Sequence, residues 1–159
     1  MISAFCKWLA ATRLSVMLGD TLWVVPLVQT IHLLLIAAVM ASALLFTMRL
    51  LKVSGLDQSP AEAARRFAPA LGMALSGLAL SGAILIVAEP ARELTNPAFA
   101  VKMLLIAVAL PATLWVLRRA RASDAARVSG TVRWIGGVSL LLWIGVVTAG
   151  RWIAYLQEQ

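Results

Sequence analysis

The chain has 159 residues, of which 62% are hydrophobic and only 13% are charged, and its formal net charge is +7. Soluble domains carry roughly a quarter charged residues, so this chain has too few polar side chains to cover a water-facing surface. The composition therefore excludes a soluble globular protein.

The first 18 residues have the pattern of an amphipathic helix. On a helical wheel their apolar side chains fall in one arc, which contains Phe5, Trp8 and Val16, while Lys7 and Arg13 lie outside it. Helices with aromatic residues on an apolar face lie in the membrane interface. We therefore expect an interfacial helix over about residues 1–18.

Four blocks without a charged residue follow, at residues 21–48, 67–88, 103–117 and 134–150. Blocks of this length predict membrane-spanning helices, at about residues 22–51, 67–88, 98–118 and 133–155. Because the connections are short, successive helices should be antiparallel neighbours. The sequence predicts an all-α fold, a four-transmembrane-helix up-down bundle that forms a single integral membrane domain over residues 1–159.

Two local patterns add detail to the second span. The run from Ser59 to Glu62 reads Ser-Pro-Ala-Glu, which is typical of a capping box with proline in the first helical position. Small residues then recur inside the span, and because small side chains let helix backbones approach closely in lipid, we expect them to form a tight helix–helix contact. They are Gly72, Ser76, Gly77, Ser81 and Gly82.

The positive charges are unevenly distributed between the two sides of the predicted bundle. Of the 14 Lys and Arg residues, nine follow the first or third span, and five lie in the tail, between spans two and three, or at the C-terminus. The positive-inside rule then places loops 52–66 and 118–133 in the cytoplasm and both termini outside. This basic charge favours contact with the lipid bilayer, and no nucleic acid is expected as a partner, because no basic run is interleaved with aromatic residues.

His32 is the only histidine and lies inside the first predicted span, with Gln29 one turn before it on the same face. Placing an ionisable side chain inside a membrane span costs free energy, so such residues mark function by default. Three interpretations remain open for His32: a structural hydrogen bond to a neighbouring helix or to Gln29, a ligand to haem or copper, and a contact in a proton or substrate path.

A metal site would need partners for His32. Met103, about one turn into the third span, is the candidate soft ligand at a similar depth, although methionine also fills gaps in cores. A bis-histidine haem within one chain is excluded, since there is no second histidine. Cys6 is the only cysteine, which excludes an internal disulfide framework.

Other candidate residues lie near the predicted outer boundary. Glu89 and Arg151 are expected to pair there, and Trp23, near the start of the first span, is a further candidate. Lys102, near the start of the third span, is expected to extend towards the outer surface. His32, Gln29 and Arg151 would line an outward-facing polar pocket, with Trp23 and Glu89 as further candidate binding residues.

Several motifs resemble an uncharacterised family of small bacterial four-span inner-membrane proteins. They are Trp23-(x)2-Pro26, Ile31-His32-Leu33-Leu34, Arg49-Leu50-Leu51, Asn96-Pro97-Ala98-Phe99 with Lys102, and the run from Gly150 to Tyr155. The chain is also loosely similar to copper-resistance D-type proteins and cytochrome b-type membrane subunits. The resemblance implies a bacterial inner membrane, which would make the outer side periplasmic, and it transfers His32 as a candidate functional residue.

The sequence leaves three functional hypotheses. The first is a non-enzymatic inner-membrane protein, an accessory or small-molecule-handling component with a polar pocket around His32. The second is an electron-transfer or metal-handling subunit in which His32 binds haem b or copper, with Met103 or with His32 of a second copy in a homo-oligomer. The third is a structural anchor for a partner membrane subunit. The sequence itself identifies no cofactor.

Overall fold

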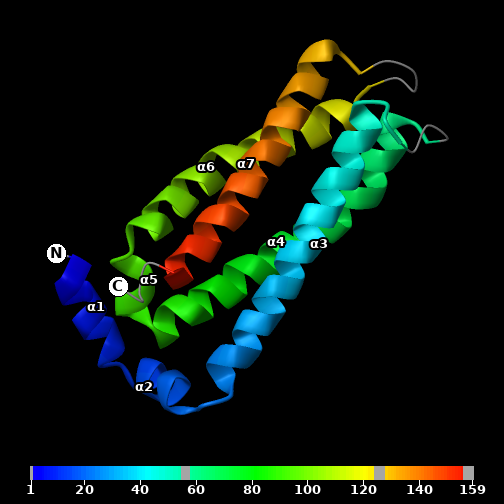
Figure 1. Cartoon of the computed structure of the whole chain (residues 1–159). Coiled ribbons are helices and arrows are strands. Elements are labelled where there is room, and N and C mark those ends of the chain that lie inside the picture. Colours follow the sequence, from blue (N-terminus) through cyan, green and yellow to red (C-terminus); the bar gives the residue numbers. More distant parts are fainter. Residues whose placement is uncertain (1, 55–57, 124–127, 156–159) are drawn as a thin grey trace.

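The computed structural model describes residues 2–54, 58–123 and 128–155, and its regular elements are all helices (Figure 1). Four of them are long and apolar enough to cross a membrane: α3 (Val24–Leu50), α4 (Pro60–Ala88), α6 (Pro97–Arg121) and α7 (Gly130–Tyr155). A helix of 25 residues, the length of α6, extends about 38 Å, against a hydrocarbon core of about 30 Å. These helices confirm the predicted all-α fold, and they indicate a multi-pass membrane protein.

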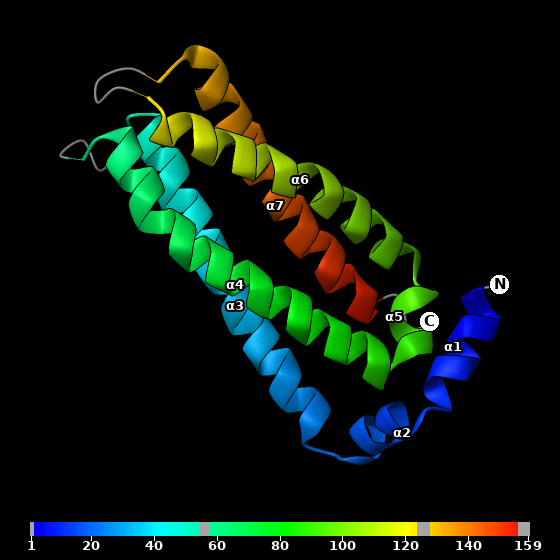
Figure 2. The ribbon, with the colours of Figure 1, turned by 180° about the vertical axis from the view of Figure 1, so that it is seen from behind.

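The four long helices form two antiparallel pairs. α3 packs most extensively against α4, and α6 against α7, while smaller contacts join α3 to α7 and α4 to α6. Figures 1 and 2 show that the two pairs lie close at one end and diverge towards the other. The short helix α5 (Pro90–Leu94) connects α4 to α6 at the diverging end. We call this the α5 end, and the opposite end, with the α3–α4 and α6–α7 connections, the loop end.

In α3, α4 and α6, buried side chains concentrate in the half near the loop end, whereas those of α7 extend along its length to Ile153. In α3 they all lie in the second half of the helix, at Val39, Ala43, Phe46, Thr47 and Leu50. In α6 all but Ala98 lie between Ala109 and Ala120. The side chains in the first half of α3 are half-buried or exposed, so the polar residues of α3 near the α5 end occupy its less tightly packed half.

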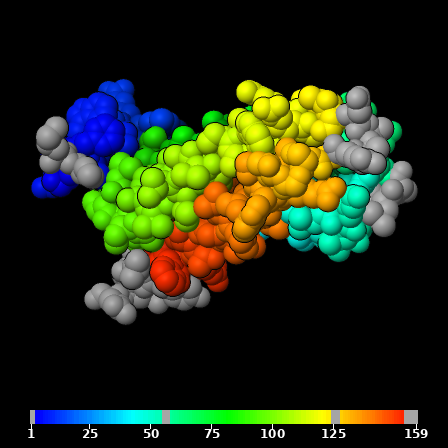
Figure 3. Space-filling model, turned by 90° about the horizontal axis from the view of Figure 1, so that it is seen from above, coloured from blue at the N-terminus to red at the C-terminus, as the bar shows by residue number. Residues whose placement is uncertain are grey.

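The N-terminal segment forms two short helices, α1 (Ile2–Ala10) and α2 (Arg13–Asp20), at one end of the elongated body (Figure 3). Our expectation of one helix over residues 1–18 missed the break. It occurs because Thr12 has extended backbone angles and its Oγ1 accepts a hydrogen bond from Ser15 N, 3.3 Å away, which caps α2. Phe5 and Trp8 are exposed, as expected for aromatic residues facing a membrane interface.

The capping box predicted at the start of the second span is confirmed. Ser59 Oγ accepts from Glu62 N at 3.1 Å, and Glu62 Oε2 accepts from Ser59 N at 2.7 Å. The two contacts satisfy backbone donors that a helix start leaves without partners. This local pattern therefore determines where α4 begins.

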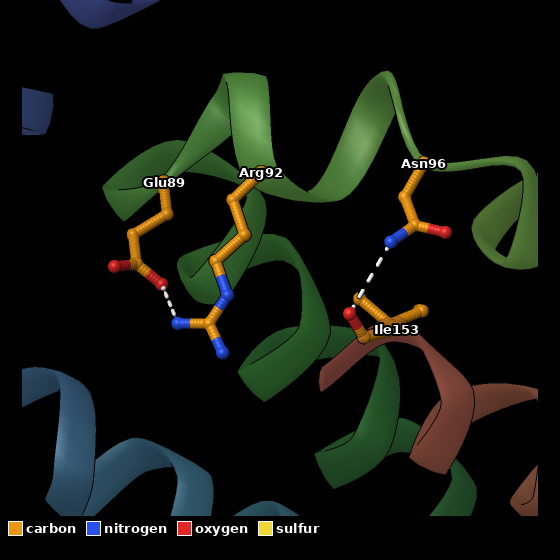
Figure 4. Close-up of polar contacts among 4 residues, drawn as sticks. All are labelled: Glu89, Arg92, Asn96 and Ile153. Carbon is orange, nitrogen blue, oxygen red and sulfur yellow. Dashed lines mark hydrogen bonds and ion pairs between the residues drawn. The ribbon is translucent and has the colours of Figure 1, made fainter. Parts of the chain in front are cut away.

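At the α5 end, the side chain of Asn96 joins the start of α6 to the end of α7 (Figure 4). Its Oδ1 accepts from Ala98 N at 2.9 Å, which caps α6, and its Nδ2 donates to Ile153 O at 3.2 Å. The buried side-chain amide of Asn96 thus connects two helices, and its partner Ile153 is 57 residues away in the sequence.

This double role predicts different losses for two substitutions of Asn96. Asn96→Ala removes both contacts and should lower the free energy of unfolding by about 2 kcal/mol, since a cap contributes about 1 kcal/mol and a hydrogen bond about as much. Asn96→Ser keeps a capping oxygen but is too short to reach Ile153, so it should lose about half as much. Thermal unfolding in mild detergent measures both variants. Equal losses would show that the cap contributes nothing.

Candidate functional site

The only histidine forms a hydrogen bond between two helices. His32 Nδ1 on α3 lies 2.7 Å from Ser81 Oγ on α4, and the same hydroxyl lies 2.7 Å from Gly77 O. A carbonyl can only accept, and a hydroxyl has one hydrogen to give. The Ser81 hydroxyl therefore donates to Gly77 O, and His32 Nδ1 donates to Ser81 Oγ. In the neutral imidazole, this assignment leaves Nε2 as the acceptor.

The two residues meet because they lie at the same depth on antiparallel helices. His32 is eight residues after the first residue of α3, Val24, and Ser81 is seven before the last residue of α4, Ala88. At 1.5 Å per residue, both lie about 11 Å from the α5 end of their helices.

Small residues of α4 let α3 approach at this level. A Cβ atom on Gly82 would lie 3.6 Å from His32 Cε1, and one on Gly77 would lie 2.9 Å from Leu35 Cδ1. The predicted small-residue contact is thus confirmed for Gly77, Ser81 and Gly82. Gly72 and Ser76 are exposed, and Gly72 has no neighbour within 4 Å of such an atom.

A second ionisable side chain, that of Lys102, lies at a similar depth on another long helix. Lys102 on α6 is half-buried, and its Cδ lies 3.9 Å from where a Cβ on Gly150 of α7 would be. Its ammonium interacts electrostatically with both His32 and Glu93. Lys102 is thus half-buried next to α7, where Gly150 leaves room for its aliphatic chain. The site therefore combines groups from three long helices.

The four other predicted binding residues differ in exposure and in contacts. Gln29 is half-buried, whereas Trp23 and Arg151 are exposed. Glu89 forms an ion pair with Arg92, three residues later, at 2.6 Å (Figure 4). The contact of Glu89 with Arg151 stays a prediction.

The metal-site hypothesis gains no second ligand from the structure. Within the described residues, no group of three or more His, Cys, Asp or Glu side chains could hold a metal ion. Met103 is 47% exposed, and its pairing with His32 stays a prediction. The positive charge of Lys102, which interacts electrostatically with His32, disfavours a metal cation there.

Sequence reasoning missed the roles of Ser81 and Lys102 in this site. We interpreted Ser81 only as a small residue and Lys102 only as a lipid-facing charge. The signal that could have found both is depth: residues of antiparallel spans at equal distances from the same membrane surface can meet. His32, Ser81 and Lys102 all lie within about three helical turns of the α5 end.

Sequence reasoning also missed a buried polar network between α6 and α7. Thr113 Oγ1 lies 2.7 Å from Ala109 O and 2.7 Å from Ser139 Oγ, and it accepts from Trp143 Nε1 at 2.9 Å. The Thr113 hydroxyl donates to the carbonyl, and its oxygen accepts from the other two groups. Its polar atoms are fully paired, so we assign this network to helix association and not to ligand binding.

Comparison with known proteins gives a family and no activity. The sequence profile of a family of unknown function (DUF6644) matches residues 5–156. No curated protein and no solved structure matches the chain. The family match confirms the resemblance to an uncharacterised family, while bacterial origin and similarity to copper-resistance D-type or cytochrome b-type subunits stay predictions.

Proposed function

We propose a function for this chain, which belongs to the DUF6644 family of unknown function, from the polar groups that meet between its spans. The protein is a non-enzymatic inner-membrane component that binds a small molecule around His32 near the α5 end. This end faces the periplasm, with both termini, and loops 52–66 and 118–133 face the cytoplasm, as the distribution of Lys and Arg favours.

The observation that carries this proposal is the hydrogen bond from His32 to Ser81, with Lys102 of α6 at a similar depth in the bundle. Any two polar side chains could form a hydrogen bond that only holds the two helices together. Here, a second ionisable group from α6 reaches the same level, and intramembrane ionisable residues are costly enough to indicate function. The first half of α3, which carries His32, is also less closely packed than its second half.

The available atoms indicate the class of ligand. His32 Nε2 can accept a hydrogen bond, because Nδ1 is the donor to Ser81. The Lys102 ammonium offers donors and a positive charge. A small carboxylate that also carries a hydroxyl group would satisfy both, through its anionic oxygen at Lys102 and its hydroxyl hydrogen at Nε2.

Lactate, a small hydroxycarboxylate, serves as the probe for this proposal. We expect it to raise the thermal unfolding temperature of detergent-purified protein in a concentration-dependent manner, because a ligand bound only to the folded state stabilises it. His32→Phe and Lys102→Met should each weaken this effect by about tenfold or more, as hydrogen bonds to charged groups contribute about 1.5–3 kcal/mol. Thr30→Ala, an exposed change on the same helix, should leave it unaltered.

Two results would contradict the proposal. If lactate stabilises the His32→Phe, Lys102→Met and native proteins equally, its effect does not come from this site. A Soret absorption band or bound copper that disappears in His32→Ala would instead favour the metal-binding alternative. The structural-anchor alternative predicts a partner subunit that co-purifies with both native protein and His32→Ala.

A further inference from the structure

A pocket at the loop end lies away from His32. It has a volume of about 250 Å³ and lies between the end of α3, the residues that follow it, and the first turns of α4. Its polar lining includes Arg49, Ser54, Gln58 and Arg66. Two guanidinium-bearing residues thus contribute to one pocket.

The two arginines are held in place in different ways. Arg49 is half-buried, and its Nε donates to the backbone oxygen of Gln58, which fixes the plane of the guanidinium. Arg66 is exposed, and its Cζ lies 5.9 Å from the centre of the Phe67 ring. Guanidinium groups match the planar, multidentate geometry of phosphate oxygens.

The local charge favours an anion. Glu62 is the only carboxylate at the loop end within the described residues, and its Oε2 is already bonded to Ser59 N in the capping box. In the full sequence, the segments that follow the first and third spans also include Asp57 and Asp124. The nine Lys and Arg residues that follow the first and third spans outnumber these three acids.

The pocket also has an apolar side directed towards the middle of the bundle. Leu45, which is 50% exposed, lies one helical turn before Arg49, and Phe67 follows Arg66. Charged groups therefore line the pocket at the end of the bundle, and apolar groups lie next to them on the membrane side. This gradient matches a phospholipid, whose phosphate lies at the membrane surface and whose acyl chains extend into the hydrocarbon.

We propose that this pocket binds the phosphate group of an anionic phospholipid. Arg49 and Arg66 contact the phosphate oxygens, and the acyl chains lie against Leu45 and Phe67. The two arginines could bind the phosphate of any phosphate ester. The apolar side of the pocket favours a phospholipid over a soluble phosphate ester.

Binding to the purified full-length protein in mild detergent tests the proposal, with short-chain phosphatidylglycerol as the probe. Replacing Arg49 and Arg66 together with glutamine should weaken binding by about 30-fold, at about fivefold for each arginine near a membrane surface. The control is Arg118→Gln with Arg121→Gln, which removes the same charge from exposed residues at the same end. This control should retain near-native affinity.

The binding of two further probes distinguishes an anionic phospholipid from other sources of phosphate. Phosphatidylcholine, which has no net charge, and glycerol 3-phosphate, which has no acyl chains, should each bind at least tenfold more weakly than phosphatidylglycerol. Glycerol 3-phosphate binding as tightly as the lipid would overturn the proposal in favour of a soluble ligand. Equal losses in the two double variants would overturn it in favour of non-specific charge attraction. If the Arg49 change prevents folding, Arg66→Gln alone should still show the fivefold loss.

Discussion

Replacing Trp143 with alanine is expected to lower the free energy of unfolding by about 3–5 kcal/mol, because truncation of a large buried side chain leaves a cavity. Trp143 is only 4% exposed and belongs to the main core cluster. Its loss also removes a hydrogen bond to Thr113 Oγ1. Reversible unfolding in a detergent of fixed composition, followed by far-UV circular dichroism, measures the change.

Two control variants separate packing from hydrogen bonding at this position. Trp143→Phe keeps most of the apolar volume and removes the Nε1 donor, so it should lose about 0.5–2 kcal/mol, as expected for interhelical hydrogen bonds in membranes. Trp134→Ala truncates a side chain that is 72% exposed on the same helix, and it should change stability little. A loss for Trp134→Ala as large as that for Trp143→Ala would contradict the assignment of Trp143 to the core.

The positions of the spans could be predicted from the sequence because they depend on local composition. A membrane-spanning helix needs about 20 predominantly apolar residues, and α3 and α4 cover most of the two longest runs without a charged residue. The start of α4 was equally predictable, since the capping box from Ser59 to Glu62 involves only neighbouring residues. Lipid exposure and local hydrogen bonding therefore account for most of the architecture.

The site could be predicted only in part, because it depends on contacts between helices. His32 stood out as the one histidine within a span, but its partner Ser81 is 49 residues away. Periodicity within α4 cannot distinguish the small residues that face α3 from Gly72 and Ser76, which do not. Only the relative rotation and depth of two helices decide that difference, and both are set by packing across the whole pair.

The buried network around Thr113 was unpredictable for the same reason. Threonine and serine are frequent in membrane helices and usually bond to the carbonyl one turn earlier, as Thr30 does with Pro26 O. Thr113 makes that local bond too, but it also accepts from Ser139 and Trp143 on α7. The additional contacts arise only once α6 and α7 are paired.

Adjacent glycines in α7 provide the second large expected effect. Gly136 is buried, and a Cβ there would lie 3.0 Å from Leu50 Cδ1 and 3.8 Å from Val116 Cγ1. Leu50 and Val116 are each only 2% exposed, so neither side chain can move into solvent. Gly136→Leu would force four additional carbon atoms into this contact and should lower the free energy of unfolding by about 3 kcal/mol or more.

Gly137 is the matched control, since it is the next residue of the same helix and a Cβ there would meet nothing within 4 Å. Gly137→Leu makes the same chemical change, and because leucine has a higher helix propensity than glycine, it should leave stability unchanged or raise it by up to about 1 kcal/mol. Comparing the two variants in one detergent removes effects of hydrophobicity and propensity that they share. A similar loss for both would show that α7 does not face α3 and α6 through Gly136, whereas a loss confined to Gly136→Leu would support the helix rotation described above.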